Sequence, residues 1–399
     1  MRYPIKYERQ ELFDVNMIIT MIFKIDKEFS ETAIKDAFDK AVGVNEILNT
    51  AIKIEEDGSA FYEGPVEPGS SITVTEGDFE TIRKAEEKKR FHLEEGEYIR
   101  AFAKSEGGKT RIMLLIHHMA GDGESSLYFI EDFLTFLSGG EKQFKKIRTV
   151  ETKPFVSPKL KAFLSNAVSK SYNKKWCDKV FTFEDMQKAY DNYWKDKTTD
   201  IEIEIIEKDE MDEILSECRK VGAKFTAYLT AKLIKDDAGV KEIGYAVNYR
   251  HDDNRSMGNQ ASGISIKHKY NGSKSIYENA AAIQKEFSKR IEEDKEASYV
   301  LDFMSSLKPT LVDAVNLIPS GLYDDKVADS LAGIMGFKGK TSDYSVTNLT
   351  KADIPSVYGD FKIEELMFAG PVVSYCKNVI SVVTCNNKTV IATHRIKYL

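Results

Sequence analysis

The sequence has few cysteines and no long apolar run, and both absences exclude classes of protein. Its four cysteines, Cys177, Cys218, Cys376 and Cys385, are scattered over 399 residues, and no two of them form a CxxC pair. The spacing therefore indicates neither a zinc ribbon nor a disulfide framework, which fits a reducing compartment such as the cytoplasm. The longest early apolar run, Met17–Phe23, is far shorter than the ~20 residues that a membrane-spanning helix needs.

The N-terminal segment lacks the apolar core of a secretory signal. It carries charges at Arg2, Lys6, Glu8, Arg9 and Glu11 instead. The chain also lacks an excess of positive charge, since its net charge is −7 and its pI is near 5.6. This balance argues against a nucleic-acid binder, although it leaves room for a local basic patch. We therefore expect a cytoplasmic protein with no nucleic-acid partner and no transmembrane segment.

The first part of the sequence alternates between strand and helix patterns. A chain of 399 residues with 42% apolar residues is long enough for two lobes, each with its own core. The spacing of apolar residues and the turn and cap residues between them define the elements. In order we expect a strand over Val15–Ile25, a helix after the N-cap Ser30, a hairpin around Asp57–Gly58, a strand over Ile72–Val74, a helix over Thr81–Arg90 and a strand over Arg111–Ile116.

Residues 141–200 differ in character, because lysines gather there and strand patterns are absent. Helices are expected over Leu160–Val168 and Met186–Tyr193. We interpret this segment as the connection between the lobes, with surface helices. Two basic clusters stand out, Lys142, Lys145 and Lys146 in the first and Lys170, Lys174 and Lys175 in the second.

The remaining sequence repeats the strand and helix pattern without repeating the residues. The alternation of isoleucine with glutamate over Ile201–Ile205 predicts a half-buried strand. We place the first lobe and the connection at residues 1–180 and the second lobe at 181–399. Further helices are expected over Met211–Cys218, Phe225–Leu233, Ser275–Glu292 and Ala297–Asn316, and further strands over Ile243–Tyr249, Ser262–Ile266, Tyr344–Leu349, Val357–Phe361, Val379–Thr384 and Thr389–Arg395.

The segment Ile116–Ser125, which reads Ile-His-His-Met-Ala-Gly-Asp-Gly-Glu-Ser, separates a buried strand from an apolar helix over Leu127–Leu137. The order is therefore strand, two histidines, tight loop and helix. Successive side chains of a strand point to opposite faces. At most one of His117 and His118 can then face a given cleft, and the other must be packed.

This arrangement resembles the HHxxxDG motif of the acyltransferase superfamily that includes chloramphenicol acetyltransferase, peptide-synthetase condensation domains, and alcohol and plant acyltransferases. The matching residues are His117, His118, Asp122 and Gly123, and Ser125 fits a longer form of the motif in condensation domains. The resemblance implies an α/β fold of two chloramphenicol acetyltransferase-like lobes, each a mixed sheet with helices, and an active-site tunnel between them. It also implies transfer of an acyl group from a thioester to an alcohol or amine, with no covalent enzyme intermediate.

The resemblance gives His118 the role of general base, which removes the proton of the attacking acceptor. An imidazole suits this step because its unperturbed pKa of about 6.5 lies close to working pH. Two other interpretations stay open: both histidines end a strand and are satisfied by backbone groups, or they bind a metal ion. Adjacent strand side chains diverge and no third ligand stands out, so we expect no bound metal.

The resemblance implies structural roles at the site for His117, Asp122, Gly123 and Arg250. Asp122 would hold the loop through an ion pair with an arginine of the other lobe, for which Arg250 is the candidate. A guanidinium group can bind a carboxylate in a bidentate manner and so fix the loop. Gly123 would let the substrate or the helix N-terminus approach closely. The alternative for Arg250 is an ordinary surface arginine.

Ser125 and Asn348 are the candidates for contact with substrate or oxyanion. Asn348 resembles part of a second-lobe segment that lines the tunnel, where its amide would donate to the tetrahedral oxyanion. Each has a plainer alternative, helix capping for Ser125 and a turn for Asn348. The DFGWG segment of the plant enzymes is absent, and the nearest stretch is Gly333–Phe337. This departure points towards condensation-like or bacterial alcohol acyltransferase relatives.

We therefore expect a free-standing, monomeric acyltransferase that binds no cofactor permanently and uses acyl-CoA or a phosphopantetheine thioester as co-substrate. The acceptor would be a small alcohol or amine. The alternatives are a condensation-type enzyme acting on acyl groups bound to an acyl carrier protein, and a non-catalytic binding member of the fold. The lysine clusters would contact phosphates of coenzyme A or of a pantetheine arm, or else form a solvated lysine-rich surface.

Overall fold

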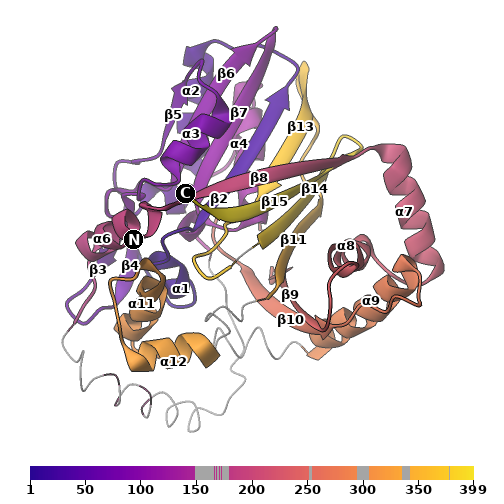
Figure 1. The fold of residues 1–399 in the computed structure, drawn as a ribbon. Coiled ribbons are helices and arrows are strands. Elements are labelled where there is room, and N and C mark those ends of the chain that lie inside the picture. The colour runs from indigo at the N-terminus through magenta and orange to yellow at the C-terminus, as the bar shows by residue number, and fades with distance from the viewer. Residues whose placement is uncertain are drawn as a thin grey trace.

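A computed structural model shows how these elements are arranged (Figure 1). It describes residues 1–148, 166, 168, 170, 172, 179–250, 254–293, 305–334, 342–376 and 378–399. Several expected features lie wholly or mostly outside the described residues. These are the helix at Leu160–Val168, the second lysine cluster, the first part of the helix at Ala297–Asn316 and most of the stretch Gly333–Phe337.

The first of the two large sheets has six strands and brings the motif strand to its centre. The order is β12 (Val357–Tyr358), β13 (Phe361–Ala369), β2 (Ile18–Ile25), β7 (Lys109–His117), β6 (Ile99–Glu106) and β5 (Ser71–Val74). Neighbouring strands are antiparallel except for β5 and β6. Helix α2 (Glu31–Val44) packs against α4 (Gly123–Leu137), and α3 (Phe79–Glu86) follows β5 in the chain. Ser30 caps α2 by accepting a hydrogen bond from the Ala33 N–H, as the sequence predicts.

The second large sheet also has six strands and carries helices that are separate from those of the first. Its order is β10 (Ala261–His268), β9 (Lys241–Asn248), β11 (Tyr344–Lys351), β14 (Asn378–Cys385), β15 (Lys388–Tyr398) and β8 (Lys197–Ile206). Strand β11 is parallel to both of its neighbours, and the other pairs are antiparallel. Helices α7 (Lys208–Lys220), α8 (Phe225–Ile234) and α9 (Ile276–Glu293) pack with one another at the end of this lobe (Figure 1).

The smaller elements pack around the first lobe. A three-stranded sheet contains β1 (Arg2–Pro4), β4 (Ala60–Glu63) and β3 (Ala51–Ile54), and the last two form the hairpin expected at Asp57–Gly58. Helix α1 (Arg9–Leu12) packs on α11 (Pro309–Leu317), which contacts α12 (Lys326–Ile334). Helix α6 (Phe183–Trp194) precedes β8. Short 3-10 helices cover Glu46–Asn49 (η1), Leu93–Glu95 (η2), His118–Ala120 (η3) and Ile318–Ser320 (η4).

The two-lobe prediction is confirmed. One apolar core lies around the first sheet and reaches α11 and α12, and a second lies between the other sheet and α7, α8 and α9. None of the helices in the described part of the chain combines the length and the apolar character that a bilayer crossing requires.

The strand predicted over Val357–Phe361 is wrong, because the chain turns inside it. Gly359 has a φ of +56°, and Tyr358 pairs with Phe361 across the resulting hairpin between β12 and β13. Strand β13 then joins β2 of the first sheet, so the C-terminal part of the chain extends the N-terminal sheet. Its register shifts between Ile363 and Glu365, and this irregularity interrupts the apolar alternation that would have marked a strand.

The half-buried strand predicted at Ile201–Ile205 forms, but its burial was predicted wrongly. It lies in β8, the edge strand of the second sheet. Ile203 and Ile205 are 50% and 53% exposed. Glu202 and Glu204, which alternate with these isoleucines, are exposed as well, so neither face of the middle of this strand is covered. Alternation identifies a strand but does not show whether another layer packs on it.

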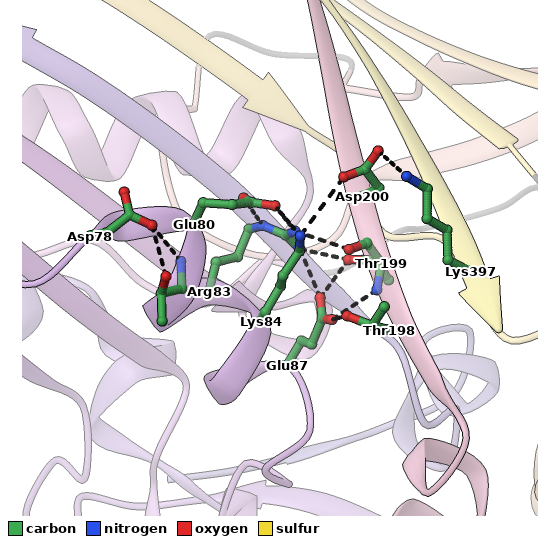
Figure 2. A network of polar contacts seen from close by, with 10 residues as sticks. Asp78, Glu80, Arg83, Lys84, Glu87, Thr198, Thr199, Asp200 and Lys397 are labelled. Atoms are coloured by element: carbon green, nitrogen blue, oxygen red, sulfur yellow. Dashed lines mark hydrogen bonds and ion pairs between the residues drawn. The ribbon is translucent and has the colours of Figure 1, made fainter. Parts of the chain in front are cut away.

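A polar network, buried at Arg83, Glu87 and Thr199, ties α3 of the first lobe to β8 and β15 of the second (Figure 2). The side chain of Arg83 is 2% exposed and donates hydrogen bonds to Glu80, Glu87 and the Thr199 hydroxyl. Glu87 in turn accepts from both the N–H and the hydroxyl of Thr199. One buried threonine therefore hydrogen-bonds to both charged groups, the guanidinium of Arg83 and the carboxylate of Glu87.

Replacing Thr199 with valine is expected to lower the free energy of unfolding by ~1–3 kcal/mol, because buried charged groups lose a hydrogen-bond partner. Urea denaturation would measure the change. Thr198→Val is the matched control on the same strand, since the Thr198 hydroxyl makes one longer bond of 3.3 Å to Glu87. Equal losses in the two variants would contradict the role given to Thr199.

Candidate active site

The motif segment forms a sharp turn between β7 and α4. Strand β7 ends at His117, the turn η3 follows, and Asp122 caps α4 by accepting a hydrogen bond from the Ser125 N–H at 3.0 Å. Gly121 has a φ of +152°, and a Cβ atom there would lie 2.6 Å from the Cβ of Ser125. Only glycine allows this close return of the chain. The turn therefore brings the end of β7 directly over the start of α4.

His117 is packed inside the first lobe. Its side chain is fully buried, and its ring lies edge-on to Phe91 with the centroids 5.6 Å apart. Its Nδ1 accepts a hydrogen bond from the Met119 N–H at 3.2 Å. Burial lowers the pKa of His117 to about 3, with further contributions from His118 and nearby arginines. This histidine stays neutral at physiological pH.

His118 differs from its neighbour in exposure and in charge environment. Its side chain is 16% exposed, and its Nδ1 lies 3.3 Å from Oε2 of Glu11. Neither of these two atoms has a hydrogen bond among the described residues. The two groups are therefore close enough for an ion pair, but their geometry is not that of a hydrogen bond. Burial alone would lower the pKa of His118, but the Glu11 carboxylate raises it above its ordinary value. The imidazole is thus a partly accessible base beside a negative charge.

Glu11 is the functional candidate that the sequence reasoning missed. It lies on α1, which is fixed by a buried ion pair of Arg9 with Asp313 of α11 at 2.5 Å. Its other carboxylate oxygen accepts a hydrogen bond from the side-chain amide of Asn259. Burial raises the pKa of Glu11, and His118 and Asn259 offset this only in part. In the sequence the N-terminal charges only argued against a secretory signal, yet Arg9 and Glu11 are both buried in the structure.

Asp122 and Arg250 form the ion pair that the resemblance implies. The guanidinium of Arg250 donates to both carboxylate oxygens, at 3.0 and 2.9 Å, across 128 residues of sequence. The Gln260 N–H donates to the same carboxylate at 2.8 Å. Burial would raise the pKa of Asp122, but Arg250 and the N–H donors hold it below the ordinary value. Both side chains are 5% exposed, so the charges are paired away from bulk water.

Ser125 and Gly123 contact the surroundings of this ion pair. The Ser125 hydroxyl donates to the Gly258 carbonyl at 2.7 Å and accepts from Arg250 at 2.7 Å. A Cβ at Gly123 would lie 2.9 Å from the Phe368 ring. Gly123 therefore allows α4 to begin close to β13. Contact of Ser125 with substrate stays a prediction.

The structure directs Asn348 away from α4. Its side-chain amide donates to the Thr226 hydroxyl of α8 at 2.9 Å, and its carbonyl oxygen accepts from the Thr350 N–H. The next residue on β11, Leu349, is the one that faces Gly123. The role of Asn348 as an oxyanion donor also stays a prediction.

Taken together, the structure brings His118, Glu11, Asp122, Ser125 and Arg250 into one connected group of contacts. Within the ranges described, no three or more histidine, cysteine, aspartate or glutamate side chains gather as metal ligands would. The chemistry that this group offers is proton transfer by one imidazole, supported by a buried carboxylate and a fixed loop.

No protein-family model matches the sequence, and no curated protein matches it either. Solved structures do match. The condensation domain from Monacolin K polyketide synthase MokA is 11% identical, with a TM-score of 0.60 over 99% of this chain and 92% of that chain. The first condensation domain of the calcium-dependent antibiotic synthetase is 11% identical, with a TM-score of 0.63 over 99% of this chain and 91% of that chain. Polyketide synthase associated protein 5 from Mycobacterium tuberculosis is 12% identical, with a TM-score of 0.57 over 98% and 94%.

The chain therefore has the two-lobe fold of condensation domains, which is a chloramphenicol acetyltransferase-like fold. The resemblance inferred from His117, His118, Asp122 and Gly123 is confirmed at the level of the fold.

Proposed function

We propose that the protein transfers an acyl group from an acyl-CoA thioester to a small alcohol or amine, with His118 as the general base. One observation carries the proposal. His118 is the partly exposed histidine of the motif, and it lies 3.3 Å from the buried carboxylate of Glu11 in a fold of the condensation-domain type. An imidazole in this setting can accept a proton and be stabilised as an imidazolium.

The reaction proceeds in two steps, attack on the thioester and collapse of the tetrahedral intermediate. The Nε2 of His118 takes the proton from the acceptor as its oxygen or nitrogen attacks the thioester carbonyl carbon. The resulting tetrahedral intermediate expels the thiolate, the carbon–sulfur bond breaks, and the imidazolium returns the proton to sulfur. No enzyme group becomes acylated, because the thioester is already activated.

Glu11 and the Asp122–Arg250 pair supply support for this step. A negative Glu11 favours a proton on Nδ1 and stabilises the imidazolium, which leaves Nε2 to act on the acceptor. The bidentate ion pair fixes the turn that carries His118. Helix α4 begins at the same turn, and the dipole at its N-terminal end would favour developing negative charge. Asn348 remains a further candidate donor to the oxyanion.

The experiment is thiol release from a panel of acyl-CoA donors with mixed alcohol and amine acceptors. Release that depends on both the donor and the acceptor is the expected result. Release at the same rate without any acceptor would indicate a hydrolase instead. No release from any acyl-CoA would argue against this donor.

A carrier-bound donor is the second candidate, because the similar solved structures include condensation domains of a polyketide synthase and of an antibiotic synthetase. The same acyl groups loaded on an acyl carrier protein test it. Faster thiol release from the carrier than from CoA would favour this candidate over the first.

Replacing Glu11 with glutamine is expected to move the acidic limb of kcat/KM to lower pH. His118 acts only when neutral, and the Glu11 carboxylate raises its pKa, so removing that charge lets the base lose its proton at lower pH. The plateau at high pH should fall by about tenfold, since the imidazolium loses its partner. A pH–rate profile measures both effects.

Glu124→Gln is the control, because Glu124 lies in the motif that carries His118 and its side chain is half-buried. The acidic limb of kcat/KM in this variant should lie at the same pH as in wild type. A Glu11→Gln profile that keeps the wild-type limb would contradict the proposed pairing with His118.

A further inference from the structure

The segment that directly precedes β10 reaches across the lobe boundary at the candidate active site. The Gly258 carbonyl accepts a hydrogen bond from the Ser125 hydroxyl at 2.7 Å. Two residues further, the Gln260 N–H donates to the Asp122 carboxylate at 2.8 Å. Asn259 lies between these two contacts, so the first lobe holds its backbone on both sides.

The side chain of Asn259 has a fixed orientation. Its Oδ1 accepts a hydrogen bond from the Ala261 N–H at 3.0 Å, as in the Asx turns that asparagine favours. The amide oxygen is thereby committed to its own chain, and Nδ2 donates to Oε1 of Glu11. Asn259 and Glu11 are 5% and 4% exposed, so bulk water has little access to this hydrogen bond.

Asn259 is the one hydrogen-bond donor to the Glu11 side chain among the residues that the structure describes. The other carboxylate oxygen, Oε2, lies 3.3 Å from Nδ1 of His118. Burial raises the pKa of Glu11 and Asp122 adds to this by repulsion, while His118 and Asn259 oppose it. A neutral donor that stabilises the charged form of a buried carboxyl keeps the carboxyl ionised to lower pH.

Other charged and titratable side chains surround this carboxyl without neutralising it. Arg9 is paired with an aspartate of α11, and Arg250 is paired with Asp122. The other neighbours are His118 of η3, Asp122 at the N-cap of α4, Asp14 after α1, Tyr62 of β4 and Glu8 at the N-cap of α1. The aspartates repel a further negative charge, so the charged form of Glu11 depends on the imidazole and on Asn259.

We infer that Asn259 is a positioning residue, which holds the Glu11 carboxylate charged and directed at His118 from across the lobe boundary. The inference rests on the proposed function, in which the imidazolium formed during acyl transfer needs a negative partner. It makes the strength of the base depend on contact between the lobes, because Asn259 belongs to the second lobe and Glu11 and His118 belong to the first.

Two substitutions separate this role from a purely structural one. Asn259→Ser removes the donor to Glu11 and keeps an acceptor for the turn, because a serine hydroxyl also bonds to the N–H two residues further on. Asn259→Ala removes both. The control is Asn279→Ser, since Asn279 is a buried asparagine of the same lobe whose side-chain amide hydrogen-bonds to backbone groups of residues 271–275.

Infrared titration of the Glu11 carboxyl measures its protonation without turnover. The band of the protonated carboxyl is assigned by its absence in Glu11→Gln. In both Asn259 variants the midpoint of this band should rise by about one pH unit or more, because the charged form loses a hydrogen bond. In Asn279→Ser the midpoint should stay at the wild-type pH.

The pH profile of kcat/KM gives the second readout. Full rate requires an ionised Glu11, so the acidic limb should move to higher pH in both Asn259 variants, and the rate at high pH should return close to wild type. Glu11→Gln should behave in the opposite way, with its limb at lower pH and a lowered plateau. A residue that only supported the fold would not move the limb to higher pH.

A wild-type midpoint in Asn259→Ser, together with a raised midpoint in Asn259→Ala, would assign Asn259 to the turn alone and overturn the inference. An equal rise in Asn279→Ser would also overturn it. Acyl transfer with midpoint and limb unchanged in both Asn259 variants would overturn the inference and leave the proposed function standing. A raised midpoint in these variants of a protein that transfers no acyl group would support the hold of Asn259 on Glu11 and overturn the proposed function.

Discussion

Replacing His118 with alanine is expected to lower kcat/KM for acyl transfer by ~10²–10⁴-fold, the range typical for loss of a general base. The reason is local. His118 is the partly exposed imidazole of the motif, while His117 is fully buried and has a pKa lowered to about 3. The buried histidine cannot take over proton abstraction. Acceptor-dependent thiol release in wild type and variant would measure the loss.

The same substitution should leave the fold intact, because Nδ1 of His118 makes no hydrogen bond within the described residues and Glu11 keeps its hydrogen bond from Asn259. Thermal unfolding of the variant should therefore stay close to wild type. His92→Ala is the matched control, since the side chain of His92 is 48% exposed and lies outside the motif. Activity retained in His118→Ala would contradict the assignment of His118 as the base. An equal loss of activity in His92→Ala would show that the effect is not particular to His118.

Replacing Arg250 with alanine is expected to lower the free energy of unfolding by ~3–5 kcal/mol, because it leaves the buried carboxylate of Asp122 without its partner. Activity should fall as well, since the turn that carries His118 loses its anchor. Urea denaturation at neutral pH gives the first effect, and the thiol-release assay on the folded fraction gives the second.

The destabilisation expected for Arg250→Ala depends on pH. Arg250 holds the pKa of Asp122 below its ordinary value, so the pair stabilises the fold at pH above the unfolded-state pKa. That stabilisation is lost as the pH falls through the folded-state pKa and the carboxylate is protonated. The difference between wild type and Arg250→Ala should therefore be largest at neutral pH and shrink in acid.

Arg255→Ala is the control for loss of an arginine. Its guanidinium pairs with Glu131 and Asp353 and is 32% exposed, so its removal should change the free energy of unfolding by ~1 kcal/mol or less. The double variant Asp122→Ala/Arg250→Ala removes both charges and should be more stable than Arg250→Ala alone. Equal destabilisation by the Arg250 and Arg255 variants would show that the ion pair with Asp122 has no special role.

The strand, turn and helix around His118 could be predicted because their signals are local. The apolar run of β7, the glycine at Gly121 and the helical spacing of α4 lie within one stretch of sequence. The partner of Asp122 lies 128 residues away, and only the resemblance to a known motif pointed to Arg250. Spacing along the chain carries no information about a contact of that range.

Glu11 and β13 could not be predicted for the same physical reason. The burial of Glu11 depends on Asn259, which lies 248 residues further along the chain, and on His118, which follows strand β7. Strand β13 is stabilised by pairing with β2, which belongs to the other end of the chain. A short charged helix and a strand with an irregular register acquire their structure from partners that are distant in sequence. Ile203 and Ile205 show the opposite case: their alternation predicted a buried face, but no other layer of the described structure packs on it and both side chains are exposed.

Transfer of a labelled acyl group tests the central claim most directly. Carbon-13-labelled acyl-CoA would be incubated with a mixed panel of alcohols and amines, and mass spectrometry would follow the label in wild type and His118→Ala. The account predicts labelled ester or amide in amounts equal to the thiol released by wild type, and loss of this product in the variant. Label recovered only as the free acid, or product formed equally by His118→Ala, would contradict it.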